Sequence, residues 1–159
     1  MKVKTTTTLG IGIALYVALS AMIKIPLIGH IQTDMGYIAF GVFCVMFGWL
    51  GAIVGIIGCL IESLIFSGWL PIGWMAGQLA IGAICGIAYK KTSNKVICSL
   101  ITVVAVFIGI AIIKTGIECV LYSIPLNVKF VKNFTAFVAD SIPMLIGMFL
   151  GFRLDKIRR

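Results

Sequence analysis

The sequence predicts an all-α integral membrane protein, a six-transmembrane-helix bundle whose N and C termini are both cytoplasmic. Of its 159 residues, 61% are hydrophobic and only 11% are charged, which is too apolar for a soluble domain with a hydrated surface. A helix needs about 20 apolar residues to cross a bilayer, so a chain of this length supplies about six spans with short loops. We therefore expect residues 1–159 to form a single transmembrane domain.

Six apolar stretches are expected to form the spans, and they follow one another closely along the chain. The spans are predicted at residues 9–28, 34–47, 50–67, 71–89, 96–122 and 128–152. The start of the chain resembles a secretory signal, with cleavage as the alternative. Its apolar run continues to Ile28, however, and the topology requires a first span, so we expect it to be retained. Pro71 suits the first turn of the fourth span, whereas Pro143 lies inside the sixth and is expected to kink it or to free a backbone carbonyl.

The apolar run 35–66 fits either one long helix or two short helices that turn near residues 47–51. Charge distinguishes these two possibilities. With two helices, both termini and the lysine-rich loop 90–95 lie on one side and bring nine of the 13 Lys and Arg residues together there. The positive-inside rule favours that arrangement and makes this side cytoplasmic. The net charge of +8 is thus explained by topology, and no nucleic-acid partner is expected.

Polar side chains inside the apolar stretches fall in the predicted outer half of the bundle. Ionisable groups at membrane depth are costly, so they normally face a partner or a water-filled cavity. We therefore expect a pocket that opens outward, with Asp140 as its deepest acid. The outer polar residues are Lys24, His30, Gln32, Asp34, Glu62, Lys114, Glu118, Asn127, Lys129, Lys132 and Asn133.

Helical spacing indicates which of these groups share a face. On the fifth span Lys114, Thr115, Glu118 and Tyr122 align with Ala111. On the sixth span Lys129, Asn133, Ala136 and Asp140 form one stripe. No catalytic residue is predicted. The predicted ligand-binding residues are Glu62, Trp69, Trp74, Gln78, Lys114, Glu118, Tyr122, Asn133 and Asp140.

Each assignment has a structural alternative. Lys114 and Glu118 can neutralise one another four residues apart, Asp140 can pair with Lys114, and Glu62 can make a polar contact between helices. The three aromatic residues can instead form an interfacial belt. For Lys24, Lys129 and Lys132, extension to the outer surface is the expectation, in preference to ligand contact.

Enzyme signatures are missing from the sequence. The chain has one histidine and no HExxH, GxSxG or P-loop motif, so we predict neither an enzyme nor a cofactor or metal site. Its five cysteines are scattered and include no CxxC pair, so packing roles are expected for them.

The first span carries a row of small residues, Gly10, Ala14, Ala18 and Ala21, that suits close contact with another helix. With its length, its topology, this Ala14/Ala18 step and the outer polar cluster, the chain resembles the substrate-binding S components of energy-coupling factor (ECF) transporters. The resemblance implies a bacterial plasma-membrane protein that binds a water-soluble vitamin or a related heterocycle near its outer side. It also implies docking through Ala14 and Ala18 onto a transmembrane coupling subunit that carries two cytoplasmic ATPases.

Two other interpretations remain open at this point. One is an autonomous, oligomeric carrier that uses Asp140, Glu118 or Glu62 as a proton site. The other is a structural membrane subunit whose polar residues only hold helices together. Both signs of charge occur in the outer cluster, which favours a neutral or zwitterionic ligand over a strongly anionic one. The sequence does not distinguish among riboflavin, pantothenate, folate, thiamine or pyridoxine precursors, a queuosine precursor and nucleobases.

Overall fold

The computed structural model describes residues 3–22, 24–26 and 32–158 of the chain. These residues form helices joined by short connections and one small hairpin. The helices are α1 (Val3–Met22), α2 (Gly36–Phe47), η1 (Gly48–Gly51), α3 (Ala52–Phe66), α4 (Ile72–Lys91), α5 (Lys95–Val106), η2 (Phe107–Lys114), α6 (Thr115–Tyr122) and α7 (Leu126–Arg158), and the strands are β1 (Lys24–Pro26) and β2 (Gln32–Asp34).

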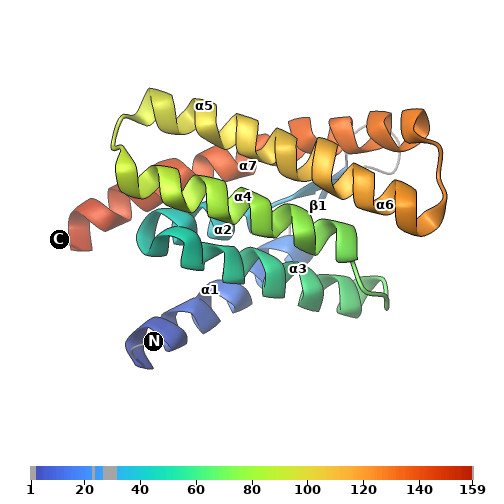
Figure 1. The fold of residues 1–159 in the computed structure, drawn as a ribbon. Helices are drawn as coiled ribbons and strands as arrows, with labels where there is room; N and C mark the ends of the chain where they lie inside the picture. The colour runs from blue at the N-terminus through green and yellow to red at the C-terminus, as the bar shows by residue number, and fades with distance from the viewer. Residues whose placement is uncertain (1–2, 23, 27–31, 159) are drawn as a thin grey trace.

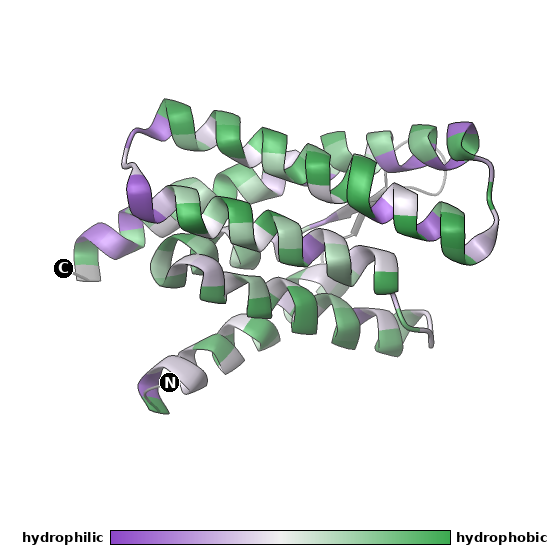
Figure 2. Cartoon of the chain, in the orientation of Figure 1, coloured by the Kyte–Doolittle hydropathy of each residue, from purple (hydrophilic) through white to green (hydrophobic). Residues whose placement is uncertain are grey.

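Five helical segments among the described residues are long and apolar enough to cross a membrane. They are Val3–Met22, Gly36–Phe66, Ile72–Lys91, Lys95–Tyr122 and Leu126–Ile157. Large hydrophobic side chains are exposed along them, including Ile11, Ile65, Leu79, Leu100 and Val131. In Figure 2 the ribbon of α5 is mostly coloured as hydrophobic. A surface of this kind suits lipid, and the chain is a multi-pass membrane protein.

The prediction for the first span was wrong at both ends. Helix α1 begins at Val3 and ends at Met22, and residues 24–26 form β1, which pairs antiparallel with β2. A proline disfavours helical backbone at the residue before it, so Pro26 favours an extended Ile25. This hairpin also corrects the expectation of a purely helical protein. His30 lies outside the described residues.

The chain reverses direction between α2 and α3. Helix α2 ends at Phe47. The next residue, Gly48, has a φ of 65° in the left-handed region that favours glycine, and η1 completes the turn. A Cβ on Gly51 would lie 2.6 Å from the Cys44 backbone, and one on Gly55 would lie 2.8 Å from the Phe40 ring. Residues later in α3 thus meet residues earlier in α2, so the two helices are antiparallel. The turn lies within residues 47–51, where it was predicted.

The ends of the bundle differ in what they carry. The N terminus, the C terminus and the α4–α5 connection lie at one end of the molecule, on the left in Figure 1. The α6–α7 connection lies at the other end. Polar residues gather at the left end, where α4 ends and α5 begins (Figure 2). This distribution agrees with the predicted grouping of basic residues with the two termini.

Helices α2 and α7 pack closely because of glycines. A Cβ on Gly41 would lie 2.7 Å from the carbonyl oxygen of Met144, and one on Gly147 would overlap the carbonyl oxygen of Ile38. Helix α7 continues through Pro143, which is buried among these contacts.

Gly147→Ala is expected to destabilise the protein by about 1 to 3 kcal/mol, since the added methyl group forces the two backbones apart. Gly116→Ala is the matched control, because a Cβ there would meet nothing within 4 Å. Thermal unfolding in detergent measures both. Equal unfolding temperatures for the two variants would contradict the close α2–α7 contact.

Candidate functional site

A cavity of about 360 Å³ lies at the end of the bundle away from the two termini. Its walls come from α1, β2, α3, the α3–α4 connection, α4, η2, α6 and α7. Seven of the nine predicted ligand-binding residues line it, namely Glu62, Trp69, Trp74, Lys114, Glu118, Asn133 and Asp140. The predicted faces of the fifth and sixth spans therefore meet at one space.

Gln78 and Tyr122 do not line the cavity. Gln78 is 1% exposed and lies behind the wall, where its Nε2 donates a 3.4 Å hydrogen bond to the hydroxyl of Tyr16. Tyr122 is 39% exposed, and its ring centroid lies 5.6 Å from that of Trp69. Gln78 thus supports a wall residue, and Tyr122 packs behind an aromatic one.

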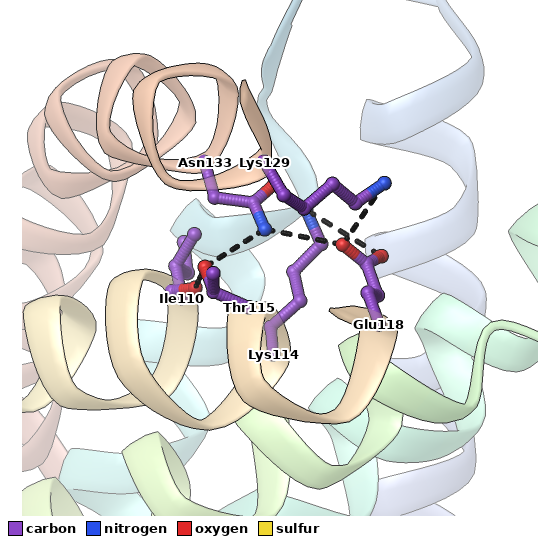
Figure 3. Close-up of polar contacts among 6 residues, drawn as sticks. All are labelled: Ile110, Lys114, Thr115, Glu118, Lys129 and Asn133. Atoms are coloured by element: carbon purple, nitrogen blue, oxygen red, sulfur yellow. Dashed lines mark hydrogen bonds and ion pairs between the residues drawn. The ribbon is translucent and has the colours of Figure 1, made fainter. Parts of the chain in front are cut away.

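A hydrogen-bonded cluster centred on Asn133 joins η2, α6 and α7 (Figure 3). The Asn133 side chain accepts from Lys114 Nζ at 2.7 Å and donates to Thr115 Oγ1 at 2.9 Å and to Glu118 Oε2 at 3.1 Å. Lys129 lies 3.2 Å from the same carboxylate. One amide therefore uses both its oxygen and its nitrogen to position a lysine and a glutamate.

The local backbone explains how these side chains reach the cavity. Residues 107–114 form a π-helix, and Thr115 Oγ1 donates to the carbonyl of Ile110, five residues back, at 3.2 Å. Widened helical turns of this kind occur frequently at functional sites. Lys114 and Thr115, adjacent in sequence, are both buried toward α7.

Trp74 forms the wall beside Lys114. The Lys114 ammonium lies 3.6 Å from the centroid of the Trp74 ring, within cation–π distance. Glu118 Oε1 is 3.9 Å from the same ammonium. Lys114, only 4% exposed, is thus compensated by an amide, a carboxylate and an aromatic face. The alternative that Lys114 and Glu118 pair with one another describes only part of this arrangement.

Acidic groups from β2 and α7 meet on another part of the wall. Asp34 Oδ2 accepts from the Tyr16 hydroxyl at 2.7 Å, and its Oδ1 accepts from Gly36 N–H at 2.8 Å and from the Ser20 hydroxyl. The Asp34 N–H in turn donates to Asp140 Oδ1 at 3.0 Å. Asp140, 1% exposed, therefore contacts β2, in place of the structural partner Lys114 considered from the sequence.

Some wall residues were not predicted to contact a ligand. Tyr16 and Ser20 line the cavity from α1, whose predicted role was docking only. Their spacing of four residues on one helix face was the available signal. Lys129 and Lys132 also line the cavity, although the sequence favoured their extension to the outer surface. Among residues 3–22, 24–26 and 32–158, no group of three His, Cys, Asp or Glu side chains is arranged to hold a metal ion.

Helix α1 presents a second surface of interest. Its residues Gly10, Ala14, Ala18 and Ala21 are exposed, and a Cβ on Gly10 would meet nothing within 4 Å. The opposite face, with Leu9, Tyr16 and Ser20, is buried against the bundle. The row of small residues is therefore open along α1.

Comparison with known proteins gives consistent matches over nearly the whole chain. Residues 1–156 match the family model described as ECF-type riboflavin transporter, S component. A UPF0397 protein of Lactobacillus acidophilus is 26% identical over 92% of this chain and 85% of its own length. A UPF0397 protein of Streptococcus thermophilus is 23% identical over 91% of this chain and 86% of its own length.

Among solved structures, the S component for biotin from an ECF-type ABC transporter has the same fold. It superposes with a TM-score of 0.70 over 98% of this chain and 92% of its own length, at 19% sequence identity. The membrane-spanning helices, the fold and the family match agree with one another. The chain belongs to the ECF-type riboflavin transporter S component family and is a membrane substrate-binding subunit, not an enzyme.

Proposed function

We propose that this S component captures a water-soluble vitamin or a related small heterocycle from outside the cell in the cavity described above. The observation that carries the proposal is the placement of seven polar and aromatic side chains from α3, α4, η2, α6, α7 and the α3–α4 connection around one space. Buried charged groups normally require partners, and a bound ligand would add further partners to the side-chain contacts already made. Trp69 and Trp74 would stack on the ligand, and Glu62, Lys114, Glu118, Asn133 and Asp140 would hydrogen-bond it.

The proposed orientation places the cavity on the outside and both termini in the cytoplasm. The chain would cross the membrane six times, because the apolar segment Gly36–Phe66 reverses at η1. Lys90, Lys91 and Lys95 gather at the end of the bundle where the termini lie, as the positive-inside rule requires for a cytoplasmic side. Since the relatives are bacterial, the membrane would be a bacterial plasma membrane.

The substrate is proposed only as a class. The matching family is named for riboflavin and the structural neighbour for biotin. The structural neighbour is 19% identical and supports the fold alone. Substrate specificity would depend on the side chains that line the cavity.

Delivery is proposed to depend on partners. The sequence has no nucleotide-binding motif, so ATP hydrolysis would come from two cytoplasmic ATPases bound to a transmembrane coupling subunit. The exposed Ala14 and Ala18 of α1 would dock on that subunit, because small residues allow close approach of a second helix.

Reconstitution distinguishes this proposal from an autonomous carrier. The small molecule that is released from the purified protein is first identified and prepared in labelled form. It is then added to liposomes that contain either the chain alone or the chain with its coupling subunit and ATPases. Uptake is expected only in liposomes that contain the coupling subunit and the ATPases, and only when ATP is present on the side of the membrane where the ATPases lie. ATP-free uptake by the chain alone would overturn the proposal and favour the carrier.

A further inference from the structure

The cavity has two poles of opposite charge. The acidic pole consists of Asp34, which accepts from Tyr16 and Ser20, and Asp140, which accepts from the Asp34 N–H. A further acid, Glu62, also lines the cavity. The basic pole consists of Lys114, Lys129 and Lys132, with Glu118 among them. Both poles include residues of α7, Asp140 in the acidic pole and Lys129 and Lys132 in the basic pole. The spacing of these residues along the helix therefore sets the distance between the poles.

The described residues supply the acidic pole with hydroxyl and N–H donors. Asp34 accepts three hydrogen bonds, which fixes its carboxylate. From the described residues Asp140 accepts one, from the Asp34 N–H at 3.0 Å, and a carboxylate has about four acceptor positions. Among the described side chains, no Lys or Arg forms an ion pair with either acid. The Asp140 carboxylate therefore has acceptor capacity left for a donor that enters the cavity.

The basic pole has more lysines than acids. Glu118 is shared by Lys114 at 3.9 Å and Lys129 at 3.2 Å. Lys132 also lines the cavity, and the described residues place no acidic side chain within ion-pair distance of it. Glu118 thus pairs with two ammonium groups, and Lys132 has no acidic partner among the described side chains, which leaves positive charge for an anionic group of the ligand.

The distance between the poles sets the size of the ligand. Lys132 and Asp140 are eight residues apart on α7, which corresponds to about 12 Å between their Cα atoms. Both residues line the cavity. A single ring with a charged substituent at each end fits such a span and the cavity volume of about 360 Å³.

We propose that the cavity selects a zwitterionic ring compound, which places a protonated nitrogen against Asp140, beside Asp34, and a carboxylate against Lys132, beside Lys129. A ligand without a cation would leave the buried Asp140 carboxylate uncompensated, which is costly, and a ligand without an anion would give the half-buried Lys129 and the exposed Lys132 no additional partner. This inference rests on the proposed binding function and narrows its substrate class.

A matched series of four benzene derivatives tests the proposal by isothermal titration of ligand-stripped protein in nanodiscs. The zwitterionic probe is 4-(aminomethyl)benzoate. The cationic probe is 4-methylbenzylamine, the anionic probe is 4-methylbenzoate, and the neutral probe is 4-methylbenzyl alcohol. We expect the zwitterion to bind at least about tenfold more tightly than each of the others, as for a hydrogen bond to a charged group. If it binds no better than the best of the other three, the proposal is wrong.

Two variants assign the poles. Asp140→Asn should reduce the preference for the zwitterion over 4-methylbenzoate, and Lys132→Gln should reduce its preference over 4-methylbenzylamine, each by roughly tenfold. Lys156→Gln changes an exposed lysine of α7 at the opposite end and should alter neither ratio. Unchanged ratios in both pole variants would also overturn the assignment, and the wild-type series decides if a variant does not fold. A tightly bound molecule found in the purified protein, whatever its charge, would leave the binding function in place.

Discussion

Replacing Ala14 and Ala18 together with phenylalanine is expected to reduce ATP-driven uptake to background while leaving the affinity for the ligand unchanged. Both alanines are exposed on α1, whereas Tyr16 and Ser20, which line the cavity, lie on the buried face of the same helix. Phenylalanine rings on the open face would prevent close approach of a partner helix. Uptake by liposomes with the coupling module and titration of the isolated protein measure the two effects.

The control for this variant is Gly116→Phe, which adds the same ring to an exposed position of α6 where a Cβ would meet nothing within 4 Å. Its uptake should equal that of the wild type. If the double alanine variant retained uptake, the docking role of α1 would be wrong. If it lost ligand affinity as well, the small face of α1 would contribute to the stability of the bundle and not to docking.

Asn133→Leu is expected to abolish ligand binding and to lower the free energy of unfolding by about 3 kcal/mol. The change removes the 2.7 Å acceptor of Lys114 and the donor to Glu118, leaving a buried ammonium and a buried carboxylate short of partners. Thermal unfolding in nanodiscs gives the stability, and titration gives the affinity. Asn127→Leu is the control, since Asn127 is exposed and its side chain accepts from the next backbone N–H at 2.9 Å.

A structural role for the same cluster predicts a different pattern. Glu118→Gln keeps the shape of the side chain and removes its charge, so it should fold and lose affinity by roughly tenfold or more. If Glu118→Gln lowered stability but bound ligand normally, the cluster would serve only to hold η2, α6 and α7 together. That result would support the structural-subunit interpretation.

Most spans were predictable because bilayer-crossing helices must be apolar over nearly their whole length. The turn at η1 was predicted from charge, because two helices within residues 35–66 would place the lysines of residues 90–95 on the same side as both termini, whereas the uniform hydropathy of 35–66 fits one helix or two. The end of the first span was not predicted by hydropathy. The apolar run continues beyond Met22, but Pro26 favours an extended Ile25, and residues 24–26 form β1.

The cavity was predictable in outline because polar side chains at 3.6-residue spacing on adjacent helices tend to face one another. Its details depend on backbone irregularity and on contacts distant in sequence. The π-helix 107–114 leaves no mark in a periodic pattern. The contact between Asp34 and Asp140, 106 residues apart, follows from the hairpin that sequence analysis did not anticipate. Gln78 lies behind Tyr16 because α1 forms part of the wall, whereas α4 contributes Trp74.

Native mass spectrometry of the gently purified protein, followed by release and identification of any bound small molecule, tests the central claim most directly. We predict one vitamin-like molecule per chain in the wild type and none in Asn133→Leu. A wild-type protein that carries no ligand, and whose unfolding temperature is unchanged by a panel of vitamins and nucleobases, would contradict the assignment of the cavity as a substrate site.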